Sequence, residues 1–224
     1  STIAQISDNV FNIETSPEQA ALCLREANLC FAYAPRHHPA MRHVAALRQA
    51  LGFSTLFNLL GPLTNPAGAR RQVLGTRPEL ADRLLEVLIR LGAQRVMVVS
   101  GVDPTLGTLC DISVTGPTRV AAFDAATGET RHFTLTPEEL GLPRYPSARE
   151  LEIRSVEDSA ARLRDILAGR PGISRDIVLA NAAAARGAAG GADAGAQALP
   201  RVAAAVDSGA ARRTLERLVT LSHA

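Results

Sequence analysis

The sequence contains no lysine and no tryptophan, and only 4% of its 224 residues are aromatic. All 24 basic residues are therefore arginine, and 22 acidic residues offset them to a net charge of +2. So small a charge argues against a nucleic-acid partner. Because aromatic rings are scarce, the core must be built from aliphatic side chains, which the 46% hydrophobic content can supply.

Long apolar runs and a cysteine framework are also missing. No segment has the roughly 20 apolar residues of a membrane-spanning helix, and no basic stretch with a following apolar segment opens the chain. Cys23, Cys30 and Cys110 are odd in number and lack metal-site spacing. We therefore expect reduced thiols in a soluble, cytoplasmic protein with no membrane partner.

The first part of the sequence has the pattern of helices only. In "SPEQAALCLREA", Ser16 is expected to cap a helix that begins at Pro17, with Gln19 completing a capping box. A second helix is predicted over 39–51 and a short one over 54–60. Because these helices are too few to bury their apolar faces among themselves, they must lie against something else.

The pattern changes to mixed helix and strand after residue 66. Two short apolar segments, 71–75 and 95–101, lie on either side of an amphipathic helix over 78–92. This arrangement is typical of a βαβ unit whose sheet is covered on both faces. Residues 118–135 alternate around a turn at Thr127-Gly128 and predict a hairpin.

The remainder is expected to be helical, with caps at Ser155 and Ser174 and a break or restart at Pro200. We predict an α/β fold, with a mostly parallel sheet, flanking helices and a hairpin, plus a partial all-helical small domain. The predicted boundaries are 1–66 for the helical segment, in which 1–15 are unassigned, and 67–224 for the α/β domain.

Arg48 lies in the middle of an apolar stripe on the second helix, formed by Met41, Val44, Ala45, Leu47 and Leu51. An arginine that loses water without a partner is costly, so this one should meet an anion. Its planar guanidinium suits a carboxylate or phosphate. Periodicity alone favours a structural ion pair with Glu14, Glu18 or Glu26, or a side chain that reaches solvent.

Longer motifs add to this interpretation. Residues 16–68, "SPEQAALCLREANLCFAYAPRHHPAMRHVAALRQALGFSTLFNLLGPLTNPAG", strongly resemble the anthranilate phosphoribosyltransferase family of tryptophan biosynthesis. The resemblance continues through "QVLG", "VTGPT", "FTLTPEELGLP", "RDIVLANAAAA" and "AVDSG". It implies a small helical domain beside a larger α/β domain, usually in a homodimer. It also implies transfer of a phosphoribosyl group from phosphoribosyl pyrophosphate to anthranilate, assisted by Mg²⁺.

The resemblance assigns an acceptor site but no catalytic residue. Arg48 matches the arginine that binds the anthranilate carboxylate, and His38 matches a histidine that lines the same channel. The segment "GPLTNP" matches the channel border and contributes Gly61, Pro62 and Asn65. The structural alternatives are that His38 caps a helix and that Gly61-Pro62 simply ends one.

Two elements depart from the family pattern. The "GTGGD" phosphate loop and the "KHGN" element, which lie upstream in relatives, have no counterpart in the sequence. Relatives hold magnesium with an adjacent Asp-Glu pair, whereas "LCDISVTGPT" places Cys110 and Asp111 there. Because magnesium prefers hard oxygen ligands, Asp111 is expected to bind it weakly and Cys110 hardly at all. Asp103 is the alternative carboxylate, and Ser100 replaces a histidine common in the family.

Three functional hypotheses follow from the sequence. The first is an incomplete anthranilate phosphoribosyltransferase, expected to be inactive or nearly so by itself, as a homodimer or with a second chain covering the helical segment. The second is a non-catalytic, diverged homologue that acts as a small-acid-binding or partner subunit. The third is a relative with another acceptor, in the manner of pyrimidine nucleoside phosphorylases, against which the "HPAM" and "GPLTNP" segments argue.

Overall fold

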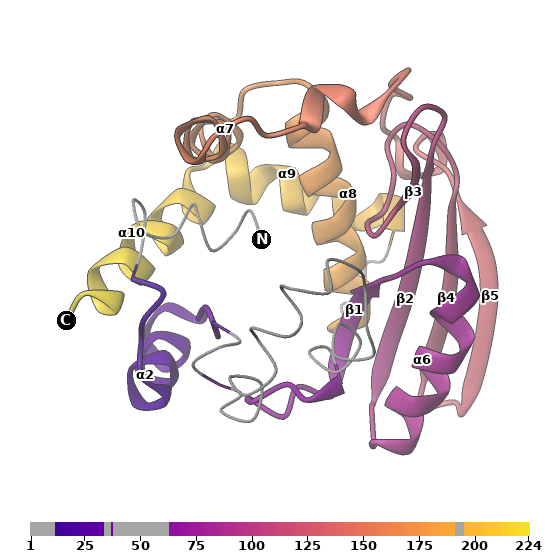
Figure 1. Cartoon of the computed structure of the whole chain (residues 1–224), viewed down its shortest axis with the longest axis horizontal. Helices are drawn as coiled ribbons and strands as arrows, with labels where there is room; N and C mark the ends of the chain where they lie inside the picture. Colours follow the sequence, from indigo (N-terminus) through magenta and orange to yellow (C-terminus); the bar gives the residue numbers. More distant parts are fainter. Residues whose placement is uncertain (1–11, 34–36, 38–62, 191–194) are drawn as a thin grey trace, which may run out of the picture. The chain divides into compact units, whose positions relative to one another are not determined.

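The computed structural model describes residues 12–33, 37, 63–190 and 195–224 (Figure 1). Its chain forms two compact units. The first comprises residues 1–67, 153–168 and 208–224, and the second comprises 68–152 and 169–207. Among the described helices, none combines the length and hydropathy needed to cross a bilayer.

The predicted βαβ unit is confirmed and lies in the second unit. Strand β1 (Arg71–Gly75) is followed by helix α6 (Pro78–Arg90) and strand β2 (Arg95–Asp103). The two strands pair in parallel, with Val73 opposite Met97. Helix α6 forms because its leucines recur on one face, which is buried while the other faces carry its charges.

The α/β class is confirmed, but the prediction of a mostly parallel sheet is wrong for the described strands. Strands β3 (Gly107–Leu109) and β4 (Thr118–Asp124) both pair antiparallel with β2, and β5 (Glu129–Leu135) pairs antiparallel with β4. In the order β1-β2-β4-β5, β1 and β2 are the only described neighbours that pair in parallel. The prediction failed because β2, being covered on both faces, has the continuous apolar run that is typical of parallel strands.

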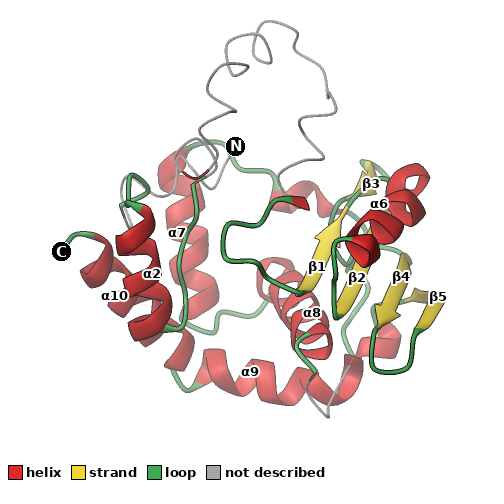
Figure 2. Ribbon diagram, turned by 90° about the horizontal axis from the view of Figure 1, so that it is seen from below, coloured by secondary structure: helices red, strands yellow, loops and turns green. Residues whose placement is uncertain are grey.

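The predicted hairpin is confirmed as β4 and β5. Asp124 pairs with Glu129, and Gly128 adopts a positive φ of 71° in the turn, a conformation that glycine reaches without strain. The hairpin extends the sheet by two strands beyond β2. Helix α6 packs against β2 and β4 on one face of this sheet, and α8 lies on the opposite face (Figure 2).

Helix α8 (Ile173–Ala188) supplies the other half of the main core. Its Ala180 and Ala184 pack with Val99 and Val120 of the sheet in one buried apolar cluster. The predicted cap at Ser174 is wrong, because the helix begins at Ile173 after Gly172. Glycine provides the required φ of 134° there.

The helix restart predicted at Pro200 is confirmed. A 3₁₀ turn, η4 (Gly195–Ala198), precedes helix α9 (Leu199–Asp207), so the proline falls in the first turn, where its missing N–H does no harm. Two further 3₁₀ turns, η2 (Glu138–Leu140) and η3 (Ala148–Leu151), connect the hairpin to the following segment.

The first unit contains α2 (Pro17–Ala27), α7 (Val156–Leu167) and α10 (Ala210–Ser222). The caps predicted at Ser16 and Ser155 are confirmed, since each hydroxyl accepts a helix N–H. The capping box is not formed as predicted, because the Gln19 side chain donates instead to the Leu221 carbonyl at 3.2 Å.

Helix α10 packs against α2 around a small core of Ile13, Cys23 and Leu218. The unit therefore continues the helical segment with residues from the C-terminal part of the chain. The predicted boundary at residue 66 is close to the division at 67–68. The predicted α/β domain of residues 67–224, however, wrongly includes α7 and α10, which belong to the first unit.

Candidate functional site

The loop of residues 110–117 crosses the carboxyl ends of the parallel strands β1 and β2. Two glycines allow this close approach. A Cβ atom on Gly75 would lie 1.7 Å from the carbonyl oxygen of Cys110, and one on Gly101 would lie 2.5 Å from that of Asp111. Because ligands of open α/β sheets gather at the carboxyl ends of strands, the loop occupies a position suited to binding.

Asn181 of α8 fixes the loop from the opposite side. Its Oδ1 accepts a hydrogen bond from the Ile112 N–H at 2.9 Å, and its Nδ2 donates to the Ile112 carbonyl at 3.2 Å. The same Nδ2 donates to the Ile177 carbonyl within the helix at 2.9 Å. The residue next to Asp111 is therefore held by both of its backbone polar groups.

Hydroxyl groups organise the rest of the loop. The buried Ser113 Oγ donates to the Val102 carbonyl at 2.8 Å and accepts from the N–H groups of Thr115 and Gly116. Thr118 Oγ1 accepts from the Ser113 N–H at 2.9 Å. This network ties the "SVTGPT" segment to β2 and leaves Asp111 on a rigid support.

Cys110 and Asp111 are adjacent and both exposed, as the predicted metal position requires. Asp111 keeps solvent contact, although partial burial raises the pKa of its carboxyl group. The described residues contain no cluster of three or more histidine, cysteine or acidic side chains that would hold a metal unaided. As a carboxylate with hard oxygen donors, Asp111 would suit Mg²⁺ as a single protein ligand, with phosphate oxygens or water completing the coordination.

Asp103 is not available as the replacement ligand that the sequence suggested. Its side chain is 2% exposed. Its Oδ1 accepts from the N–H and hydroxyl of Thr105 and from the Leu106 N–H, and its Oδ2 accepts from the Ala148 N–H. Burial raises the pKa of this carboxyl group, but the hydrogen bonds outweigh it and hold the pKa well below its usual range. The role of Asp103 is to fold the 103–107 turn and anchor η3.

Ser100 is likewise engaged within the protein. It is buried, and its Oγ donates to the Thr76 carbonyl at 2.7 Å. The hydroxyl thus joins β2 to the end of β1, which is a structural role.

Of the five residues predicted to form the acceptor site, the structure describes Asn65. Arg48, His38, Gly61 and Pro62 lie outside the described residues. Asn65 is described, and it is exposed, with its Oδ1 accepting a hydrogen bond from the Ala67 N–H at 2.9 Å. This hydrogen bond stabilises the turn that contains Asn65, and because the residue is exposed it is accessible to a ligand.

Asn181 was not singled out from the sequence, although a signal was present. It is one polar residue within the alanine-rich stretch "LANAAAA", and a side chain in that setting usually satisfies backbone groups from elsewhere in the fold. Which backbone it satisfies, however, depends on the tertiary contact between α8 and residue 112.

The comparisons with known proteins agree with this architecture. The model of the glycosyl transferase family, a/b domain, matches residues 4–212. An anthranilate phosphoribosyltransferase of Methylorubrum extorquens (strain PA1) is 48% identical over 209 residues, which are 93% of this chain and 60% of that protein.

Solved structures give the same result. The crystal structure of anthranilate phosphoribosyltransferase from Thermus thermophilus is 37% identical, with a TM-score of 0.86 over 98% of this chain and 64% of that one. The Saccharomyces cerevisiae enzyme in complex with PRPP and Mg is 22% identical over 99% of this chain and 62% of that one, and with a TM-score of 0.84 it shares the fold. The chain thus spans about 60% of the length of the curated relatives that it matches.

Proposed function

The chain belongs to the glycosyl transferase family, a/b domain, and from this premise we propose that it acts in the transfer of a phosphoribosyl group from phosphoribosyl pyrophosphate to anthranilate, as a pentosyltransferase of tryptophan biosynthesis. The observation that carries the proposal is the 48% identity, over 93% of the chain, to a relative named for this reaction. The position of Asp111 at the carboxyl ends of β1 and β2 supports it.

Binding of the acceptor is proposed for Arg48, His38, Gly61, Pro62 and Asn65. An arginine set in an aliphatic stripe suits the anthranilate carboxylate, because a guanidinium forms two parallel hydrogen bonds with it. The exposed Asn65 belongs to the same "GPLTNP" segment. These contacts contribute orientation, which brings the acceptor amine close to the ribose carbon that it attacks.

The leaving group sets the electrostatic requirement. When pyrophosphate departs, negative charge grows on its oxygens and positive charge grows on the ribose ring, and stabilising such charges is usually the largest catalytic contribution. Magnesium, when bound, neutralises the phosphate oxygens. We propose that Asp111 is this chain's ligand for the ion, and that Cys110 weakens the site because a thiol is a poor magnesium ligand.

A partner is proposed for the helical segment, either a second copy in a homodimer or another chain. Leu24 of α2 and Leu29 just after it are 43% and 42% exposed on the described surface of the first unit. Neighbouring exposed leucines of this kind are often covered by association.

The three cysteines are free, which supports a reducing compartment such as the cytoplasm.

The test is a coupled assay of the purified protein, together with a polypeptide that supplies the "GTGGD" loop, with anthranilate, phosphoribosyl pyrophosphate and Mg²⁺, following both loss of anthranilate and release of pyrophosphate. The proposal expects equal amounts of both. It expects Asp111→Asn to lower the rate at least tenfold, whereas Glu86→Gln, which removes an exposed carboxylate of α6, should leave it unchanged.

A second candidate function rests on Cys110 at the metal position. A small-acid-binding subunit without catalysis would bind anthranilate in calorimetry in the absence of phosphoribosyl pyrophosphate, lose this binding in Arg48→Ala, and release no pyrophosphate. Turnover in the coupled assay would reject this alternative. Absence of both turnover and binding would reject both functions.

A further inference from the structure

A pocket of about 420 Å³ lies between the sheet and α8, on the face of the sheet that α8 covers only in part. Its volume is in the range typical of small-molecule sites. Strands β2, β4 and β5 form its floor, and the small residues Ala180, Ala183 and Ala184 of α8 form one wall. All of its lining residues belong to the second unit.

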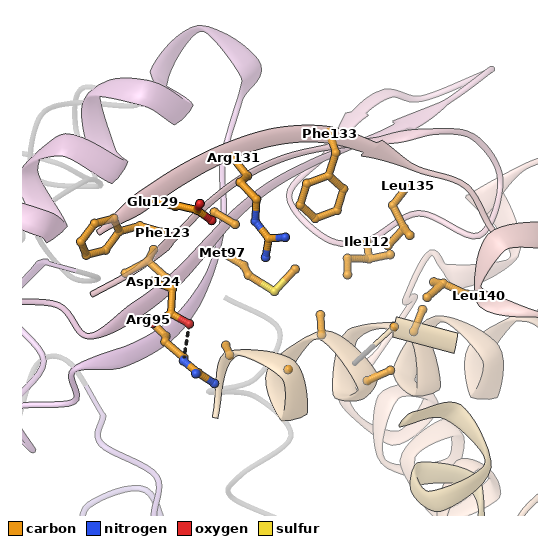
Figure 3. A pocket seen from close by; sticks show the side chains of 18 residues that line it. Arg95, Met97, Ile112, Phe123, Asp124, Glu129, Arg131, Phe133, Leu135 and Leu140 are labelled. Atoms are coloured by element: carbon orange, nitrogen blue, oxygen red, sulfur yellow. Dashed lines mark ion pairs between the residues drawn. The ribbon is translucent and has the colours of Figure 1, made fainter. Parts of the chain in front are cut away.

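The pocket is divided into a charged end and an apolar end. Residues 129, 131, 133 and 135 of β5 point to the same face because side chains alternate along a strand. Glu129 and Arg131 therefore lie at one end, and Phe133 and Leu135 continue toward the other. Figure 3 shows this order, with Ile112 and Leu140 beside Leu135 at the apolar end.

Four charged side chains line the polar end of the pocket, and two of them form no direct ion pair. Arg95 and Asp124 pair with each other, with 2.9 Å between Nε and Oδ2, and so contribute little net charge. Within the part of the chain that the structure describes, Glu129 and Arg131 form no ion pair or hydrogen bond through their side chains, although the charge of Arg131 helps to lower the pKa of the Asp124 carboxyl group. Figure 3 shows the Arg131 side chain directed into the space between the sheet and α8.

The apolar end keeps an aromatic surface open. Phe133 is 41% exposed, whereas Ile112 and Leu140 behind it are 1% and 2% exposed. A ligand that covers the Phe133 ring would remove apolar area from water, which stabilises a complex by roughly 25 cal/mol for each Å² buried. Along the strand, residue 131 lies about 7 Å from residue 133 and residue 129 about 13 Å, given a rise of about 3.3 Å per residue.

We propose that this pocket binds an apolar or aromatic α-amino acid. Its carboxylate pairs with Arg131, its ammonium group pairs with Glu129, and its side chain lies against Phe133. A zwitterion offers a direct ionic partner to both Arg131 and Glu129, while a simple carboxylic acid would leave Glu129 facing an anion. Ile112 of the 110–117 loop contributes to the apolar end, but Asp111 does not line the pocket, so the charged end that binds the amino-acid group is distinct from the proposed metal position.

The test is isothermal titration calorimetry of the full chain with L-phenylalanine as the probe. Binding is expected with a Kd below about 1 mM. Two analogues, 3-phenylpropionate without the ammonium group and phenethylamine without the carboxylate, should each bind about fivefold to tenfold more weakly, because each loses one charge-assisted contact.

Four variants locate the site. Arg131→Gln and Glu129→Gln should each weaken L-phenylalanine binding about fivefold to tenfold. Ala122→Leu should abolish it by filling the floor of the pocket. Arg119→Gln is the matched control, because Arg119 lies on the opposite face of β4 and lines another pocket.

Each other outcome rejects the proposal. No heat of binding at 5 mM probe (about five times the largest expected Kd) would show that the pocket has no such ligand. Equal affinity for 3-phenylpropionate would indicate a plain acid site. Unchanged affinity in Arg131→Gln, with Arg119→Gln as reference, would place the probe elsewhere. Because residues 129 and 131 are exposed on an edge strand, their variants should fold normally, and unchanged thermal unfolding verifies this.

Discussion

Asn181 and Ile112 are 69 positions apart in the sequence, and the Asn181 amide forms hydrogen bonds with both the N–H and the carbonyl of Ile112, at 2.9 and 3.2 Å. Ile112 is itself 1% exposed. The contact therefore attaches the loop that carries Asp111 to α8, and it replaces the water that would otherwise solvate two backbone groups.

Asn181→Ala should destabilise the protein by about 2 to 4 kcal/mol, since it leaves the Ile112 backbone groups without partners in a buried setting. Asn181→Asp keeps an acceptor for the Ile112 N–H but loses the donor, so it should destabilise the fold as well. Urea unfolding at neutral pH measures both. An alanine variant as stable as the parent would mean that the loop is held by other contacts.

Asp103→Asn should lower the free energy of unfolding by about 2 to 3 kcal/mol. The amide nitrogen of asparagine would face an N–H group that now donates a hydrogen bond to the carboxylate. The lowered pKa of Asp103 also predicts a pH effect. The folded-state pKa of Asp103 is below the unfolded value of about 3.9. The stability that its charged carboxylate contributes is therefore present above pH 4 and is lost as the pH falls further.

The difference between parent and Asp103→Asn stabilities should therefore shrink on acidification below about pH 4. Unfolding curves measured from pH 7 to pH 2.5 test this. A difference that stays constant over that range would show that the carboxylate is not held in its charged form.

Tyr145→Phe removes the 2.8 Å hydrogen bond from the phenol to Asp176 Oδ2 and should cost about 1 to 2 kcal/mol. Burial, with Asp176 nearby, raises the pKa of Tyr145 to about 12. Because an unfolded tyrosine ionises near pH 10, stability is lost as the pH rises from about 10 to about 12. The phenylalanine variant should lack this part of the alkaline decline in unfolding curves.

Gly75→Ala should destabilise the protein by more than about 2 kcal/mol, because the added Cβ would meet the Cys110 carbonyl oxygen at 1.7 Å and the backbone must move. Gly128→Ala is the control. It has open space around its Cβ but a φ of 71°, so it should cost only the conformational strain of about 1 kcal/mol. Equal losses in the two variants would contradict the close approach of the loop to β1.

Cys110→Asp should strengthen Mg²⁺ binding about tenfold in the presence of phosphoribosyl pyrophosphate, because it adds a hard oxygen ligand beside Asp111. Calorimetry with MgCl₂ measures the change, and Cys110→Ser is the matched control that removes the thiol without adding a charge. An unchanged affinity in Cys110→Asp would mean that the metal binds away from this loop.

The features that the sequence predicted correctly are those that depend on residues close together in the chain. The Ser16 and Ser155 caps, the Pro200 restart and the Thr127-Gly128 turn depend on neighbouring residues, and all were predicted. The cap at Ser174 was wrong because Gly172 supplies a backbone conformation that a serine would not adopt.

The candidate site was predictable only in part. The resemblance placed Cys110 and Asp111 at the metal position, and the structure shows both exposed beside β1 and β2. That Asp103 is fully engaged in hydrogen bonds was not predictable, since one of its partners, Ala148, lies 45 residues away. The acceptor residues around Arg48 remain a prediction.

The sequence by itself determined the local elements and the family, because caps, periodic apolar faces and turn glycines act over a few residues. Tertiary structure alone decided the antiparallel pairing of β2 with β4, the Asn181 contact with Ile112 and the pocket beneath Arg131. The physical reason is that these features depend on contacts between residues far apart in the sequence. The pattern of residue types along the chain does not specify which distant residue each one contacts.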